Sequence, residues 1–174
     1  MGCDIHMYVE YKVDDGEWKA HEQHIEEVED EYKSVRSVTA TGRNYDLFGL
    51  LAGVRTYSDG RVKPKGLPKN ISPMIKRASE YWGGDGHSHS HMTLEQFEKV
   101  LEDYNRREKD YKIKPTKRTD MFYSHDMKYE EHPPSFSTVV SGCKRHAEEL
   151  KADFILLGEK PPKIKHRLIF WFDN

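Results

Sequence analysis

The stretch MGCDIHMYVEYK, residues 1–12, alternates between two classes of side chain. Apolar residues occupy the odd positions from Cys3 to Tyr11, whereas the even positions from Asp4 to Glu10 are mostly polar. A period of two is that of a β-strand with one buried face, and the β-branched and aromatic residues favour the same structure. The sequence therefore predicts a strand with Asp4 and His6 about 7 Å apart on its polar face, because each residue rises about 3.3 Å.

The second clear strand lies near the opposite end of the sequence. HRLIFWFDN, residues 166–174, is apolar at most positions, which is typical of a strand covered on both faces. The Asp-Gly turn signal in DDGEW, residues 14–18, predicts that residues 17–21 return as a hairpin partner of the first strand. We expect the two terminal strands to pair in the centre of one small sheet.

Between these strands the sequence predicts about four helices, each with apolar residues at helical spacing. They are expected over about 42–55, 73–82, 93–108 and 135–151. Asn44 or Asp46 can cap the first of them, and Thr93 with Gln96 forms a capping box for the third. The predicted fold is α+β, as a single domain over residues 1–174 with long polar loops. Variable excursions are expected at about 22–41 and 105–134.

The composition limits the classes of protein and of partner. Charged residues make up 33% of the chain, a high share that predicts long exposed segments. A net charge of −2 gives no overall attraction to nucleic acid or to a membrane. Cys3 and Cys143 form no disulfide framework, which favours reduced thiols and a cytoplasmic location. The sequence contains no signal-peptide pattern and no apolar run of the roughly 18 residues that a membrane span needs.

The densest chemical signal is DGHSHSH, residues 85–91. Neutral imidazoles bind transition metals, and a carboxylate adds an oxygen ligand. If this loop is extended, His87, His89 and His91 share one side, and the neighbouring glycines let the backbone bend around a bound group. A histidine-rich surface loop without a chemical role explains the pattern equally well. We predict catalytic roles for Asp85, His87 and His89.

The histidine-rich loop and the terminal strands together predict a metal site. Asp4 and His6 supply a carboxylate and an imidazole, and Asp173 joins them if the terminal strands pair. The predicted ligands of a divalent ion, Zn, Mn or Mg, are Asp4, His6, His87, His89 and Asp173. In a metal-free alternative, His87 and His89 act as general acid and base. The structural alternative is that these residues form only a solvated strand face and a charged terminus.

Arg43, Asn44 and Tyr45 form a polar cluster in front of an apolar helix. An arginine holds a phosphate with two hydrogen bonds, and the N-terminus of a helix favours an anion. The cluster therefore predicts a substrate-binding site. The alternative is that Asn44 only caps the helix and Arg43 is exposed.

Five segments together resemble a family of phage and bacterial proteins known mainly as open reading frames. They are MGCDIHMYVEYK, GRNYDLFGLLAGVR, GLPKNISP, DGHSHS and FWFDN. The resemblance implies a role in host takeover or counter-defence, such as the removal of a nucleotide signal. With the His/Asp cluster and Arg43, it suggests a hydrolase of a phosphodiester or small cyclic nucleotide. The alternatives are a non-catalytic nucleotide-binding sponge and a protein inhibitor of a host defence system. We expect a small nucleotide as ligand, and neither a membrane nor nucleic acid as partner.

Overall fold

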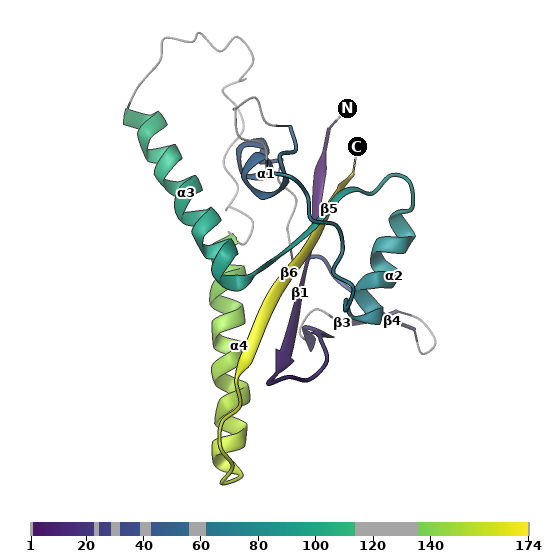
Figure 1. The fold of residues 1–174 in the computed structure, drawn as a ribbon, viewed down its shortest axis with the longest axis vertical. Helices are drawn as coiled ribbons and strands as arrows, with labels where there is room; N and C mark the ends of the chain where they lie inside the picture. Colours follow the sequence, from purple (N-terminus) through teal and green to yellow (C-terminus); the bar gives the residue numbers. More distant parts are fainter. Residues whose placement is uncertain are drawn as a thin grey trace.

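The computed structural model describes residues 2–22, 25–28, 32–38, 43–55, 62–113 and 136–173. Within these ranges, the chain forms a four-stranded antiparallel sheet with helices on both faces, and a separate two-stranded hairpin (Figure 1). The sheet order is β2 (Lys19–Ala20), β1 (Asp4–Val13), β6 (Ile164–Asp173) and β5 (His87–Thr93). The helices are α1 (Tyr45–Ala52), α2 (Pro73–Trp82), α3 (Leu94–Ile113) and α4 (Phe136–Leu156). The predicted α+β fold, with a small sheet containing both terminal strands, is confirmed.

The two terminal strands form the centre of the sheet. β1 and β6 are antiparallel over their full length, from the pair Asp4 and Asp173 to the pair Val13 and Ile164. β2 returns after the predicted turn and pairs with the outer edge of β1. β5 pairs with the other edge of β6, so β6 has neighbours on both sides, as its apolar sequence predicted.

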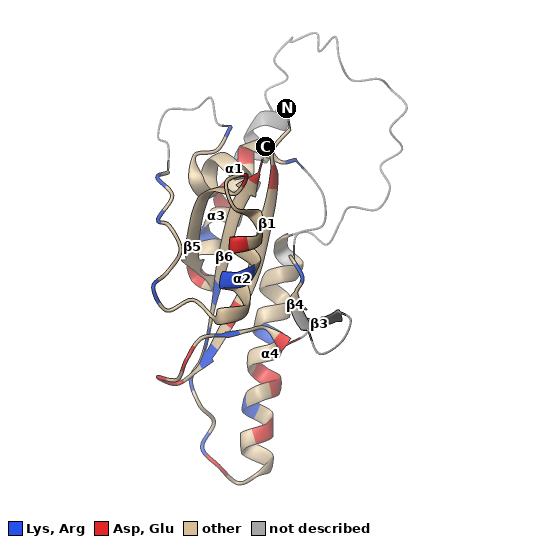
Figure 2. Ribbon diagram, turned by 90° about the vertical axis from the view of Figure 1, so that its right-hand side faces the viewer, with Lys and Arg blue, Asp and Glu red and all other residues tan. Residues whose placement is uncertain are grey.

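The sheet has a core on each face. One core packs α1, α3 and α4 against the odd positions of β1, and its largest buried side chains are Met7, Phe48, Phe97, Phe170 and Phe172. The other core packs α2 and β4 (Tyr32–Val35) against Tyr8, Ile169 and Trp171. The expected polar face of β1 is therefore largely covered: Tyr8 and Glu10 are buried. Charged side chains lie instead on the outer side of α4, where Arg145 and Lys151 pair with glutamates (Figure 2).

β5 corrects the prediction that the histidine-rich segment is a loop. It is a strand hydrogen-bonded to β6, with a bulge just after His87. Ser88 has a positive φ of 53°, so the alternation of side chains is interrupted there. His87 stacks on Phe172, whereas His89 stacks on Trp171. Because Phe172 and Trp171 project from opposite faces of β6, the expectation that the histidines share one side is wrong.

The local signals at the helix ends are confirmed. The Asn44 side chain accepts a hydrogen bond from the backbone N–H of Leu47 at 3.0 Å, and Gly53 ends α1 in the left-handed conformation. Thr93 and Gln96 form the capping box reciprocally, with backbone N–H to side-chain distances of 3.1 and 3.3 Å. These interactions form within a single turn of chain, which is why the sequence predicts them.

The two excursions are only partly described. The expected excursion at 22–41 contains an antiparallel hairpin of β3 (Ile25–Val28) and β4. Within the expected excursion at 105–134, α3 continues to Ile113. The rest of that excursion lies outside the described residues. Within the described ranges, no helix has both the length and the hydropathy needed to cross a bilayer.

Candidate active site at the ends of the terminal strands

The pairing of β1 with β6 brings three of the predicted site residues together. Asp4 and Asp173 are cross-strand partners, and the backbone N–H of Asp4 donates to Asp173 Oδ1 at 3.1 Å. The second oxygen of the same carboxylate, Oδ2, lies 3.3 Å from His6 Nε2. This is ion-pair distance, but the contact does not have the geometry of a hydrogen bond. His6 Nε2 is therefore buried without a hydrogen-bond partner among the described residues.

Arg43 completes the polar cluster from the segment before α1. Its guanidinium donates two hydrogen bonds to the Asp4 carboxylate, from Nε at 3.0 Å and from Nη2 at 3.2 Å. The hydrogen bond from Arg43 is the largest cause that lowers the pKa of Asp4. The two side chains are 53% and 49% exposed, so a dissolved ligand can reach them. Gly2 lies against the guanidinium, and a Cβ at that position would overlap it.

The other two residues of the predicted substrate cluster take structural positions. Asn44 caps α1, and its amide nitrogen donates to Tyr104 Oη at 2.9 Å. The ring of Tyr45 packs edge to face with Phe48 at 5.8 Å. The Asn44 side chain therefore caps the helix, which is the alternative to substrate binding given above. A substrate contact of Tyr45 stays a prediction.

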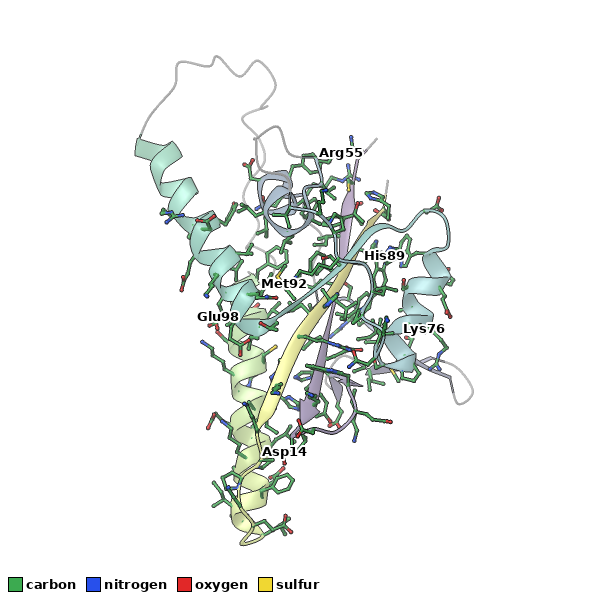
Figure 3. The ribbon with its side chains drawn as sticks, in the orientation of Figure 1. Asp14, Arg55, Lys76, His89, Met92 and Glu98 are labelled. Carbon is green, nitrogen blue, oxygen red and sulfur yellow. The ribbon has the colours of Figure 1, made fainter. Side chains whose placement is uncertain are left out.

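Two tryptophans form the aromatic part of the site. The His6 ring lies 4.0 Å from that of Trp82, at the end of α2, and 6.2 Å from that of Trp171 on β6. His89 stacks on the same Trp171 ring at 5.6 Å. Burial, followed by the neighbouring His87, lowers the pKa of His89, so this imidazole is neutral at pH 7. Figure 3 shows His89 between β6 and the end of α2.

The remaining predicted residues are more distant from the cluster. His87 Nδ1 contacts Ser88 Oγ at 3.0 Å, and its Nε2 is buried without a partner in the described part of the chain. Asp85 is exposed in the turn after α2, where its backbone N–H donates to the carbonyl of Trp82. The structure thus groups Asp4, His6, Arg43 and Asp173, places His89 next to them across Trp171, and leaves His87 and Asp85 at the margin.

Sequence reasoning did not identify Trp82, Trp171 or Arg55 as part of this end of the molecule. Trp171 meets His6 because the two residues are cross-strand partners, whereas the contact of Trp82 depends on how α2 packs over β1. Arg55 lies beyond the C-cap of α1, toward the end of the sheet where the termini lie (Figure 3). It hydrogen-bonds the Cys3 thiol, but burial dominates and raises the pKa of that thiol. Cys3 is buried, as predicted.

The predicted metal ligands fit an ion only in part. His6 Nε2 and Asp173 Oδ2 have the spacing of two ligands on one tetrahedral ion, which is about 3.4 Å for bonds of about 2.0–2.1 Å. Asp4 is engaged by Arg43, and His87 and His89 lie on opposite faces of β5. His6 and Asp173 can therefore hold a divalent ion whose remaining positions are filled by water or substrate. Ligation by the other three residues stays a prediction.

A different set of residues has the spacing of a metal site. Among the described residues, one group of three His, Cys, Asp or Glu side chains has its ligand atoms within 4.8 Å of one another: His21, His146 and His166. Sequence reasoning missed all three. The one available signal was His146, which lies on the apolar side of its helix three residues after Cys143.

Comparison of the chain with family models, with curated proteins and with solved structures gave no match.

Proposed function

We propose that the protein hydrolyses a phosphodiester in a small nucleotide, including cyclic nucleotides, at the site of Asp4, His6, Arg43 and Asp173. One observation carries the proposal. Of the four buried side-chain polar atoms that lack a hydrogen-bond partner among the described residues, two belong to His6 and Trp171, whose rings stack at the end of the sheet where Arg43 lies half exposed. Buried polar atoms are normally satisfied, so such a concentration favours a ligand site.

Arg43 supplies the contact for the phosphate. Asp4 engages two of the five N–H donors of the guanidinium, which leaves three to face an anion. Asp4 also fixes the orientation of the guanidinium plane, so little conformational entropy is lost when the phosphate binds. Gly2 permits this arrangement because it has no side chain.

The two imidazoles supply the proton transfers. His89, neutral at pH 7, takes a proton from the attacking water. His6, with the Asp173 carboxylate as counter-charge, gives a proton to the leaving oxygen. One P–O bond forms to the water oxygen and the P–O bond to the leaving alcohol breaks, so atoms and protons balance. In the alternative in which His6 and Asp173 hold a divalent ion, His6 would give no proton; the ion would supply a bound water of lowered pKa and a positive charge beside the phosphoryl oxygen.

The experiment compares wild type with His6→Gln, His89→Gln and Arg43→Ala on a panel of cyclic mononucleotides, cyclic dinucleotides and linear dinucleotides. Products are separated by chromatography. We expect kcat/KM to fall by about 10²–10⁴-fold in each histidine variant, the usual contribution of a general acid or base. Arg43→Ala should mainly raise KM, because it removes a contact with the phosphate. The matched control is Arg145→Ala, which removes an exposed arginine on α4. Absence of turnover on the whole panel, or full activity of His6→Gln, would refute the proposal.

Binding without turnover is the second candidate, and one observation favours it. Tyr81 is almost fully exposed beside Trp82, with the rings 6.4 Å apart, and an exposed aromatic ring offers a surface on which a nucleobase can stack. A sponge would bind a nucleotide with both Arg43 and Tyr81 and release it intact. Recovery of unchanged ligand after denaturation of the complex distinguishes this candidate from a hydrolase.

A further inference from the structure

Three buried histidines meet at the opposite half of the sheet from the candidate active site. His166 lies near the start of β6, His21 directly follows β2, and His146 projects from α4. They are 6%, 2% and 6% exposed, respectively. Asp173 lies seven positions after His166 on β6, a distance of about 23 Å along the strand. The cluster is therefore a separate site from the proposed active site.

The ring nitrogens of the cluster have nearly the spacing of metal ligands. His146 Nδ1 lies 3.0 Å from His166 Nε2, and a nitrogen of His21 completes a group in which every separation is within 4.8 Å. Ligands of a tetrahedral zinc ion lie about 3.4 Å apart, since each Zn–N bond is about 2.0–2.1 Å. Rotations of the rings that move each nitrogen by about an ångström would place all three around one ion.

The chemical state of the rings also suits a metal. Burial is the main cause that lowers the pKa of His146 and lowers that of His166 to about 4. Neutral imidazole is the form that binds metal. Side chains of three separate elements converge here, and each ring contacts another ring: the centroids of His21 and His146 are 4.1 Å apart.

A carboxylate lies beside the cluster. Glu22 follows His21 in the chain and accepts a hydrogen bond from Tyr11 Oη at 2.7 Å. The Tyr11 ring in turn packs edge-on against His146 at 4.7 Å, and Glu22 acts electrostatically on His146. Such a carboxylate can serve as a fourth ligand, or it can orient a ligand from the outer shell.

We propose that His21, His146 and His166 bind one divalent transition-metal ion, with Glu22 or a water molecule as the fourth ligand. Imidazole ligands suit zinc, copper, iron and nickel, and zinc is the probe used below. The ion would link α4 and the β1–β2 hairpin to β6 and would thereby stabilise the fold. The alternative is that the site binds no metal and that the three rings form a hydrogen-bonded cluster in the core.

The test measures metal in the untagged protein purified from zinc-supplemented medium. We call His21, His146 and His166 the triad, and the variants His146→Gln and His166→Gln the triad variants. They are compared with wild type and with two matched controls, His6→Gln in the proposed active site and His91→Gln on β5. We expect at least one zinc per chain in wild type, and both triad variants to bind one zinc fewer than wild type and than His91→Gln. Their zinc affinity at the triad should be weakened by more than about 100-fold, because loss of an outer-shell partner alone costs roughly 10–100-fold.

Two further measurements report on the site itself. Cobalt added to the zinc-free protein should give the intense visible bands of a tetrahedral ion in wild type and His6→Gln, and not in His166→Gln. Stoichiometric zinc should raise the Tm of zinc-free wild type by about 5–15 °C and leave that of His166→Gln unchanged.

Wild type without zinc and with a zinc-independent Tm would overturn the proposal, as would full zinc retention in both triad variants. Circular dichroism establishes that each variant is folded; if one of them is not, the cobalt bands and zinc-dependent Tm of wild type decide. Zinc lost from His6→Gln but kept in the triad variants would assign the ion to the proposed active site instead. The two proposals therefore fail in distinguishable ways.

Discussion

Replacement of Arg167 by methionine removes the cation of a buried ion pair that joins β6 to β1. Arg167 Nε donates to Glu10 Oε2 at 2.6 Å, and its two Nη groups donate to Asn70 at 2.8 Å each. The other oxygen of Glu10 accepts from the backbone N–H of Ser72 at 2.6 Å. Because Ser72 is the N-cap of α2, the pair also fixes the helix that carries Trp82 over His6.

The expected loss of stability follows from the burial of the partner. Glu10 is fully buried, so the Arg167→Met variant leaves an unpaired carboxylate in the core. Removing one member of a buried pair costs about 3–5 kcal/mol. For a chain of this size each kcal/mol lowers Tm by about 2–4 °C, so the variant should melt about 6–20 °C below wild type. Glu10→Gln keeps an acceptor for Ser72, and the double variant should recover part of the loss because no buried charge is left.

Urea unfolding followed by tryptophan fluorescence measures this difference. The control is Arg145→Ala: its arginine lies 3.7 Å from Glu149, and the two side chains are 69% and 55% exposed. Exposed pairs of this kind contribute less than about 1 kcal/mol. If the free energy of unfolding of Arg167→Met were lower than that of wild type by less than about 1 kcal/mol, water would have to reach Glu10 in the folded protein. That result would refute the idea that an unpaired Glu10 carboxylate destabilises the core.

Three smaller predictions concern residues near the site. Burial raises the pKa of Tyr8 to about 12, so its contribution to stability is complete below pH 10 and is lost as the pH rises toward 12. Between pH 8 and pH 11 the free energy of unfolding of wild type should fall by about 1.4 kcal/mol more than that of Tyr8→Phe. Equal decreases for the two proteins in parallel urea titrations would contradict this. Gly2→Ala displaces the Arg43 guanidinium, so the Asp4 pKa measured by NMR should rise toward its ordinary value; an unchanged pKa would show that the cluster tolerates a side chain there. Asn44→Ala removes the cap of α1 and should cost about 1 kcal/mol in thermal melts, whereas Asn44→Asp, which keeps an acceptor, should cost less.

The features that the sequence predicted well are those formed within a few residues or by a long periodic pattern. The cap at Asn44 and the capping box of Thr93 and Gln96 involve residues three positions apart. They can therefore be predicted without knowledge of the rest of the fold. The pairing of β1 with β6 followed from two strong strand patterns, and it brought Asp4, His6 and Asp173 together as predicted.

The features that the sequence could not predict depend on contacts between distant segments. Glu10 appeared to lie on a solvated face, and only its pairing with Arg167 explains a buried carboxylate. The bulge after His87 depends on the register between β5 and β6, so the faces of the histidines were assigned wrongly. His21 and His166 have no metal-binding motif around them, because their shared site is made by α4 and the sheet together.

The central position of the two terminal strands also constrains how the chain is made. Asp4 and Asp173, hydrogen-bonded in the sheet, are 169 positions apart. Closure of a loop that long costs about 4.5 kcal/mol of chain entropy, and a fold dominated by such contacts forms slowly. During translation β1 leaves the ribosome long before β6 exists, so its apolar residues have no partner strand until residues 164–173 have been synthesised. The nascent chain must therefore avoid aggregation throughout that interval, and a message truncated before β6 would yield a product with no central sheet.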